Sequence, residues 1–276
     1  MDQYPGRSIP RDVKRAVRQR CGFGCVVCGL PLYQYDHMEG WARVQGHRAD
    51  EITLLCHHHH GAKGGGLLPD AAVREANAEP FNLRAGVSSP LHLYYSGSSC
   101  EGVTGGNRFY SSNLGNGEVL IPVIIDGDEL FKFRFEDGQL LLTLVALNGF
   151  NQGVVWIEDN ELVQSAAPWD IELVGQRLIV RAAQRVILVD ITFDVPSRVA
   201  INRGFFLYNG VQMIVRPNGV LVANNGSFLS GNEIQDYPAG VVLGPAGEGV
   251  AGAVHLPELW RYPDLVRPDA EDPESD

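Results

Sequence analysis

The sequence has no apolar run of about 18 residues, the minimum length for a helix that crosses a membrane. It also lacks a positively charged start followed by an apolar segment, which is the pattern of a secretory signal. Only five of its 276 residues are cysteines, and they do not form an even set of disulfide partners. We therefore expect a cytoplasmic protein with reduced thiols and without a membrane partner.

Histidine is scarce outside one stretch of the chain. Six of the eight histidines and three of the five cysteines lie between Cys25 and Lys63, and only His92 and His255 lie elsewhere. The remainder of the chain contains neither metal-ligand spacing nor a nucleotide-binding loop. Metal or catalytic chemistry is therefore expected between Cys25 and Lys63.

Four residues in this stretch have the spacing of a zinc site. Cys25 and Cys28 form C-x2-C, and after 27 intervening residues Cys56 and His59 form C-x2-H. Tetrahedral zinc takes such a set of thiolates and imidazole, and a site filled by four protein ligands is structural. The alternative is two unrelated pairs of buried thiols. The spacing favours a structural Zn²⁺.

A second group of residues has the composition of a catalytic metal site. The segment Tyr33–Met38 is typical of a short strand, so Asp36 and His37 point to opposite faces. The helix expected from Cys56 to Lys63 turns by about 100° per residue, which directs His60 away from His59. Asp36 and His60 can then hold a hard divalent cation with open positions for water and phosphate oxygens. His37 is left as a general base.

These motifs resemble the HNH endonuclease family, whose ββα-metal fold is built on a zinc knuckle in many members. The resemblance covers about residues 8–68, a quarter of the chain. The matching elements are the C-x2-C at Cys25 and Cys28, the Asp36-His37 pair, and LLC-x2-H-H from Leu54 to His60. The resemblance implies hydrolysis of phosphodiester bonds, with His37 activating water and one Mg²⁺ or Mn²⁺ held by Asp36 and His60.

The chain departs from the family at the central asparagine, whose place falls on Glu51. An amide can donate hydrogen bonds, whereas the carboxylate of Glu51 can only accept them or join the metal shell. We place Glu51 with His37 among the expected catalytic residues.

Charge is divided unevenly along the chain, whose net charge is −11. Residues 1–75 carry 10 Lys and Arg against 8 Asp and Glu, or +2, and residues 76–276 carry 12 against 25, or −13. DNA is the expected partner of the basic part, and RNA stays open because phosphodiester chemistry does not require deoxyribose. A solvated helix face is the alternative for the basic helix expected over residues 11–21. The residues expected to contact phosphate groups are Lys14, Arg15, Arg18 and Lys63.

Residues 107–262 contain short apolar runs separated by turn pairs such as Asp126-Gly127 and Asp137-Gly138, which predicts β-structure throughout. In LFKFRF, alternation places Phe131, Phe133 and Phe135 on one face. A sandwich, a barrel and a stacked β-hairpin array all fit this pattern.

The sequence thus predicts an α+β protein in which a small zinc-knuckle nuclease domain, residues 1–75, precedes a larger all-β domain, residues 107–262. Residues 76–106 are expected to be a linker, and residues 263–276 an acidic, disordered tail. The acidic β-domain is expected to act in regulation, in binding a protein or ligand, or in self-association to a homo-oligomer. The alternative function is a catalytically inactive zinc module that binds nucleic acid or serves as the scaffold of an interaction protein.

Overall fold

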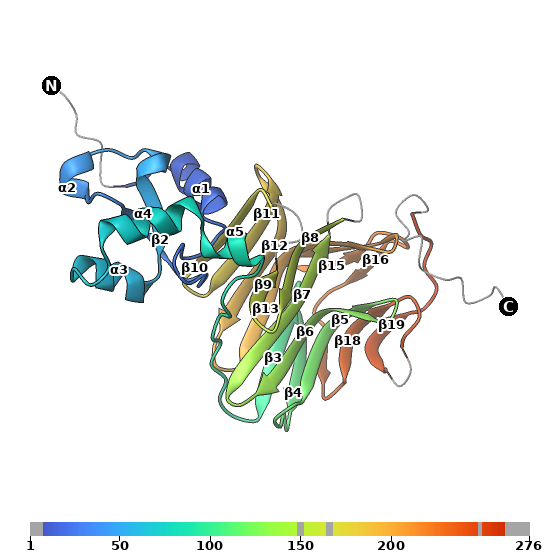
Figure 1. Ribbon diagram of the computed structural model, residues 1–276. Coiled ribbons are helices and arrows are strands. Elements are labelled where there is room, and N and C mark those ends of the chain that lie inside the picture. Colours follow the sequence, from blue (N-terminus) through green and yellow to red (C-terminus); the bar gives the residue numbers. More distant parts are fainter. Residues whose placement is uncertain (1–7, 148–151, 164–167, 248–249, 263–276) are drawn as a thin grey trace. The chain divides into compact units, whose positions relative to one another are not determined.

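A computed structural model describes residues 8–147, 152–163, 168–247 and 250–262 (Figure 1). The chain forms two compact units. Unit 1 runs to Leu91 and adds Glu161–Val163 and Trp169–Val174, and unit 2 begins at His92 and takes the rest. The expected acidic tail lies outside the described residues. No helix within the described ranges is long and apolar enough to cross a bilayer.

Unit 1 combines short helices with a β-hairpin. Its elements are α1 (Arg11–Arg20), β1 (Gln34–His37), α2 (Trp41–Val44), the 3-10 turn η1 (Ala49–Glu51), β2 (Ile52–Leu55), α3 (His57–Gly64), α4 (Asp70–Ala78), α5 (Phe81–Ala85), β9 (Glu161–Val163) and β10 (Asp170–Val174). β1 and β2 are antiparallel, with Gln34 opposite Leu55 and His37 opposite Ile52. A small unit of helices and two paired strands therefore precedes the β-rich remainder, as the sequence predicts.

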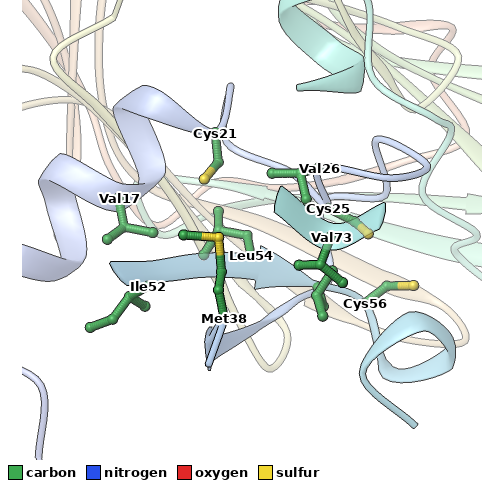
Figure 2. Close-up of a cluster of buried hydrophobic side chains, with 10 residues drawn as sticks. Val17, Cys21, Cys25, Val26, Met38, Ile52, Leu54, Cys56 and Val73 are labelled. Atoms are coloured by element: carbon green, nitrogen blue, oxygen red, sulfur yellow. The ribbon is translucent and has the colours of Figure 1, made fainter. Parts of the chain in front are cut away.

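One apolar cluster holds the helices of unit 1 against β2. All four residues of β2 are buried, and Val17 of α1 and Val73 of α4 are fully buried beside them. Cys25 and Cys56 lie at one end of this cluster and Val17 and Ile52 at the other (Figure 2). Burial of such side chains stabilises the fold by about 1.5–3 kcal/mol each. The cluster thus fixes the hairpin and the cysteines relative to one another.

Unit 2 is built from strands. They are β3 (Ser99–Thr104), β4 (Asn107–Ser112), β5 (Val119–Ile125), β6 (Asp128–Glu136), β7 (Gln139–Leu147), β8 (Gly153–Glu158), β11 (Arg177–Ala183), β12 (Val186–Asp194), β13 (Arg198–Tyr208), β14 (Val211–Arg216), β15 (Gly219–Val222), β16 (Ser227–Leu229), β17 (Glu233–Gln235), β18 (Ala239–Leu243) and β19 (Gly252–Leu256). One sheet contains β11 to β16 in chain order, with β3 beside β13, β4 beside β3 and β17 beside β4. The other has the order β19-β18-β5-β6-β7-β8.

The two sheets of unit 2 pack face to face. A Cβ on Gly102 of β3 would lie 3.2 Å from a side-chain carbon of Leu120 of β5, and a Cβ on Gly240 of β18 would lie 2.8 Å from the ring of Phe109 of β4. Two open sheets therefore form a sandwich over the residues described, and the barrel and hairpin-array alternatives are set aside.

Turn chemistry explains the hairpins of unit 2. Asp126-Gly127 joins β5 to β6, and Asp137-Gly138 joins β6 to β7. All four residues have positive φ, from 48° to 81°, which is the type I′ geometry that Asp-Gly pairs favour. On β6 the alternation in LFKFRF is as predicted, because its three phenylalanines are at most 2 % exposed while the intervening lysine and arginine are not buried.

The segment expected to be a linker contains regular structure. α5 and β3 both lie within residues 76–106. Cys100 belongs to β3 and is buried, with 1 % of its surface exposed. Gly and Ser are frequent in residues 96–106 and favour a loop, but Cys100, Gly102 and Thr104 alternate inward on β3. Gly102 is needed there because the facing sheet approaches so closely.

Candidate metal centre and nuclease site

The four predicted zinc ligands lie together. The ligand atoms of Cys25, Cys28, Cys56 and His59 all lie within 4.8 Å of one another, and within the described ranges this is the one group of three or more metal-ligating side chains. The Sγ atoms of Cys28 and Cys56 are 3.8 Å apart. His59 Nδ1 lies 3.5 Å from Cys25 Sγ and 3.2 Å from Cys56 Sγ.

Two short backbone hooks present these ligands. In the first, the Gly29 N–H donates to the Cys25 carbonyl over 2.7 Å, and Gly29 has a φ of 78° that favours glycine. In the second, Cys56 is the N-cap of α3 and its Sγ accepts the backbone N–H of His59 at 3.5 Å. The Val26 N–H donates to the Leu54 carbonyl over 3.0 Å, which joins the first hook to β2.

The geometry fits zinc. An ion with bonds of about 2.3 Å to sulfur and about 2.0–2.1 Å to nitrogen, in a tetrahedron, separates two sulfurs by about 3.8 Å and sulfur from nitrogen by about 3.5 Å. The separations of 3.8 and 3.5 Å match these edges, and the 3.2 Å between His59 Nδ1 and Cys56 Sγ is slightly shorter. A hydrogen bond with Cys28 lowers the pKa of Cys25 more than burial raises it, which favours the thiolate form that a metal ligand requires. The cluster can hold a structural metal such as zinc.

A second constellation forms where β1 meets α3. Asp36 Oδ1 lies 3.6 Å from His60 Nε2, and the Asp36 side chain is 12 % exposed against 43 % for His60. Two ligands at about 2.1 Å from one cation lie about 3.0 Å apart at a right angle and farther at wider angles. Asp36 and His60 can therefore bind one divalent cation together. Lys63, also on α3, contacts the other carboxylate oxygen of Asp36.

His37 points into the loop after β1. Its Nε2 lies 3.1 Å from the carbonyl oxygen of Gly46, and its ring lies 5.0 Å from that of Trp41 and 5.5 Å from that of His47, centroid to centroid. Because a carbonyl only accepts, Nε2 carries the proton and Nδ1 is left as the basic nitrogen. The side chain of His37 is half-buried.

Glu51 is the last residue of η1 and directly precedes β2, the second strand of the hairpin. Its carbonyl accepts the N–H of Met38 at 3.0 Å, which places it beside the end of β1. Its Oε1 lies 3.5 Å from Arg48 Nε, and its Oε2 is buried without a hydrogen-bond partner. A buried oxygen of this kind requires an explanation, since such groups are normally paired.

The residues expected to contact phosphate are in different situations. Lys14 Nζ lies 5.4 Å from the ring centroid of Tyr35, and the guanidinium of Arg15 lies 4.4 Å from the ring centroid of Trp169. Both cations are half-buried and keep exposed surface. Lys63 is 10 % exposed and its ammonium is bonded within the site.

Arg18 corrects a prediction. It was expected to contact phosphate, but it is 4 % exposed and its guanidinium donates to both carboxylate oxygens of Asp170, at 2.8 and 2.7 Å. It also donates to the Tyr35 hydroxyl at 2.5 Å and approaches Glu172 at 3.3 Å. The Arg18 guanidinium is buried and ion-paired inside unit 1, so it is not exposed for contact with a nucleic acid.

Several residues that contact the expected site residues belong to no sequence motif. Asp170 is more than 150 positions from Arg18, and no local pattern links the two. Trp41 and His47 stack at 4.9 Å beside His37, and they are separated in the sequence by a short helix and a turn that carry no motif. The excess of histidine in this stretch was the available signal for His47.

Comparisons with known proteins return no relatives. No protein-family model, curated protein or solved structure matches the chain. The function is therefore argued from the site itself.

Proposed function

We propose that unit 1 is a metal-dependent endonuclease of the HNH type that hydrolyses phosphodiester bonds in DNA. The observation that carries the proposal is the 3.6 Å approach of Asp36 Oδ1 to His60 Nε2, with the half-buried His37 next along β1. The Asp36 carboxylate and the His60 imidazole provide a cation site, and the imidazole of His37, the next residue of β1, provides a base.

Each residue has a distinct task in the proposed reaction. His37 accepts the proton of the attacking water at Nδ1, while the Gly46 carbonyl holds Nε2–H and thereby fixes the ring. Asp36 and His60 hold the divalent ion. A bound Mg²⁺ or Mn²⁺ would neutralise charge on the phosphate and on the leaving oxygen. The zinc cluster holds the start of α3, and so His60, close to β1.

Cleavage of supercoiled plasmid tests the proposal. The full-length protein is incubated with Mg²⁺ or Mn²⁺, and His37→Ala and Asp36→Asn are compared with His92→Ala, an exposed histidine of unit 2 that serves as the matched control. Loss of a general base is expected to lower the rate by about 10²–10⁴-fold, and the control should cleave as the wild type does. Cleavage that persists unchanged in His37→Ala would refute the assigned role. Single-stranded RNA in the same assay decides between DNA and RNA.

A catalytically inactive zinc module is the second candidate. It is favoured by Lys63, whose ammonium already neutralises the Asp36 carboxylate. In that case the protein would bind nucleic acid or serve as a scaffold for unit 2, and no metal would elicit cleavage. DNA binding by wild type without cleavage over a full series of divalent metals would establish this candidate in place of the first.

For unit 2 we propose a role in regulation, in binding a partner or ligand, or in self-association. Its sheet surface carries paired charges, because Arg108 pairs with Glu101 and Glu233, and Arg198 pairs with Glu101 and Asp194. Such pairing leaves little net positive charge to attract phosphate. Light scattering of the full-length protein at several concentrations tests self-association.

A further inference from the structure

Lys63 occupies an unusual position for a surface lysine of a short helix. Its side chain is 10 % exposed, and its ammonium contacts Asp36 Oδ2 and donates to the His37 carbonyl at 2.7 Å. The two residues that it contacts are the expected metal ligand and the expected base. Lys63 is therefore built into the candidate site and is not a solvated charge beside it.

The Asp36 carboxylate is shared between two partners. Oδ1 faces His60 and Oδ2 faces Lys63, and the carboxylate is 12 % exposed. An ion pair with so little solvent around it is screened weakly, so the ammonium neutralises most of the charge that would attract a cation. A divalent cation brought to Asp36 would also be repelled by the neighbouring ammonium.

The structure offers the ammonium a second acceptor. Asp70 Oδ1, at the first residue of α4, lies 4.0 Å from Lys63 Nζ, and its side chain is 44 % exposed. A lysine that leaves Asp36 can therefore turn toward Asp70 by moving its flexible end alone. Asp36 and Asp70 are two anionic positions between which one cation can be exchanged.

We propose that Lys63 is a built-in competitor for the metal site, so that a divalent cation binds Asp36 and His60 only by displacing the Lys63 ammonium toward Asp70. This inference rests on the proposed function, because it assumes that Asp36 and His60 form the cation site. In the absence of metal, the Lys63 ammonium pairs with Asp36 and takes the place of the divalent cation. Lys63 and Asp70 therefore set the affinity for the metal, although neither is a ligand.

Binding of Mn²⁺ to the zinc-loaded, full-length protein tests the exchange, with free Mn²⁺ measured by electron paramagnetic resonance. Lys63→Met is expected to lower the Kd for Mn²⁺ by about tenfold, since the competing charge is gone. Lys63→Gln removes the charge but keeps donors for Asp36 and the His37 carbonyl, and it replaces the first variant if that does not fold. Lys63→Arg keeps the charge and should bind Mn²⁺ as weakly as the wild type. Lys132→Met is the matched control, because Lys132 pairs with Glu129 at 2.6 Å in unit 2.

A double-mutant cycle tests the role of Asp70. Asp70→Asn alone is expected to raise the Kd for Mn²⁺ about threefold, because the released ammonium loses its acceptor, and to have no effect in the Lys63→Met background. An equal effect of Asp70→Asn in both backgrounds would show a plain charge effect and overturn the exchange. Unchanged or weaker Mn²⁺ binding in both Lys63→Met and Lys63→Gln would overturn the competition itself.

The failure of this inference is distinguishable from failure of the nuclease proposal. Tighter Mn²⁺ binding by Lys63→Met, together with no plasmid cleavage by any variant, would leave the competition standing and refute the nuclease. Cleavage by the wild type, together with unchanged Mn²⁺ affinity in the Lys63 variants, would support the nuclease and refute the competition by Lys63.

Discussion

Arg18 and Asp170 form a bidentate ion pair inside unit 1, with Nε and an Nη of the guanidinium 2.8 and 2.7 Å from the two carboxylate oxygens. The two side chains are 4 % and 5 % exposed. Burial alone would lower the pKa of Arg18, but the hydrogen bond to Asp170 and the charge interactions with Tyr35, Asp170 and Tyr33 together outweigh burial and raise it. A segment from far along the chain thus completes a unit whose candidate metal ligands all come from the first sixty residues.

Asp170→Ala is expected to destabilise unit 1 strongly. It leaves the Arg18 guanidinium buried without its main anionic partner, and loss of one partner from such a pair costs about 3–5 kcal/mol. Glu172→Gln is the control, because Glu172 is 30 % exposed and 3.3 Å from Arg18, so its loss should cost under about 1 kcal/mol. Urea unfolding followed by far-ultraviolet circular dichroism measures both, and equal effects of the two variants would contradict the assigned burial.

The Arg18–Asp170 pair affects any experiment in which unit 2 is removed by truncation. If unit 2 restrains the nuclease, removal of residues 107–276 should raise activity, but this removal also takes Asp170 away from Arg18. Lower activity in the truncated protein would follow from the loss of packing on α1 alone. Single substitutions in the full chain are therefore the informative experiments.

Loss of zinc is expected to unfold unit 1. Ligand binding to structural zinc is worth about 10–16 kcal/mol in zinc-finger peptides, far more than a small apolar cluster supplies. Cys56→Ala should lower the zinc content from one ion per chain to about none and reduce helical signal. Cys100→Ala, at a buried cysteine of unit 2, should retain zinc. Full zinc content in Cys56→Ala, measured by mass spectrometry of the metal, would contradict the ligand set.

Short-range spacing explains what could be predicted from the sequence. Cys25 and Cys28, and again Cys56 and His59, are three positions apart, a separation that a turn or helix start brings to one point. The burial alternation of β6 is equally local. By contrast, Arg18 pairs with a residue whose distance along the chain leaves no trace in local pattern. The local sequence around Arg18 therefore predicts a solvent-facing basic residue and gives no sign of its buried partner Asp170.

DNA binding should depend on Lys14. Its ammonium lies over the Tyr35 ring and keeps exposed surface, so it can neutralise one phosphate. Lys14→Ala is expected to weaken binding of a duplex oligonucleotide and to reduce the slope of log K against log salt concentration by about 1. Fluorescence anisotropy without divalent metal measures this, with Lys132→Ala as the control. An unchanged slope would place Lys14 on a merely solvated face.

The stability of unit 2 should fall in acid partly through Asp190. Burial would raise the pKa of Asp190, but the hydrogen bonds from Arg177, at 2.8 and 2.6 Å, together with the charges of Arg177 and Arg203 and a hydrogen bond from Asn202, outweigh it and hold the pKa below its usual value of 3.8. A carboxyl group whose pKa is lowered by folding stabilises the native state above its unfolded pKa, and this is lost as pH falls through the folded pKa. Asp190→Asn should therefore lower stability at pH 6 and lose less between pH 4 and pH 2. Parallel pH profiles of the wild type and Asp190→Asn in urea unfolding would show that the pair contributes nothing.

Glu51→Gln should separate stability from function. The Glu51 Oε2 oxygen is buried without a partner, and a neutral amide of the same shape removes the cost of burying this charge. We expect a gain of about 1 kcal/mol in the free energy of unfolding together with at least tenfold slower plasmid cleavage, because strained or unsatisfied groups persist where function retains them. Asp50→Asn is the control, since Asp50 is 65 % exposed and bonds Arg48 at 2.9 Å, and it should change neither quantity. Wild-type cleavage by Glu51→Gln would remove Glu51 from the catalytic set and leave it as a loop residue that caps the hairpin through its backbone.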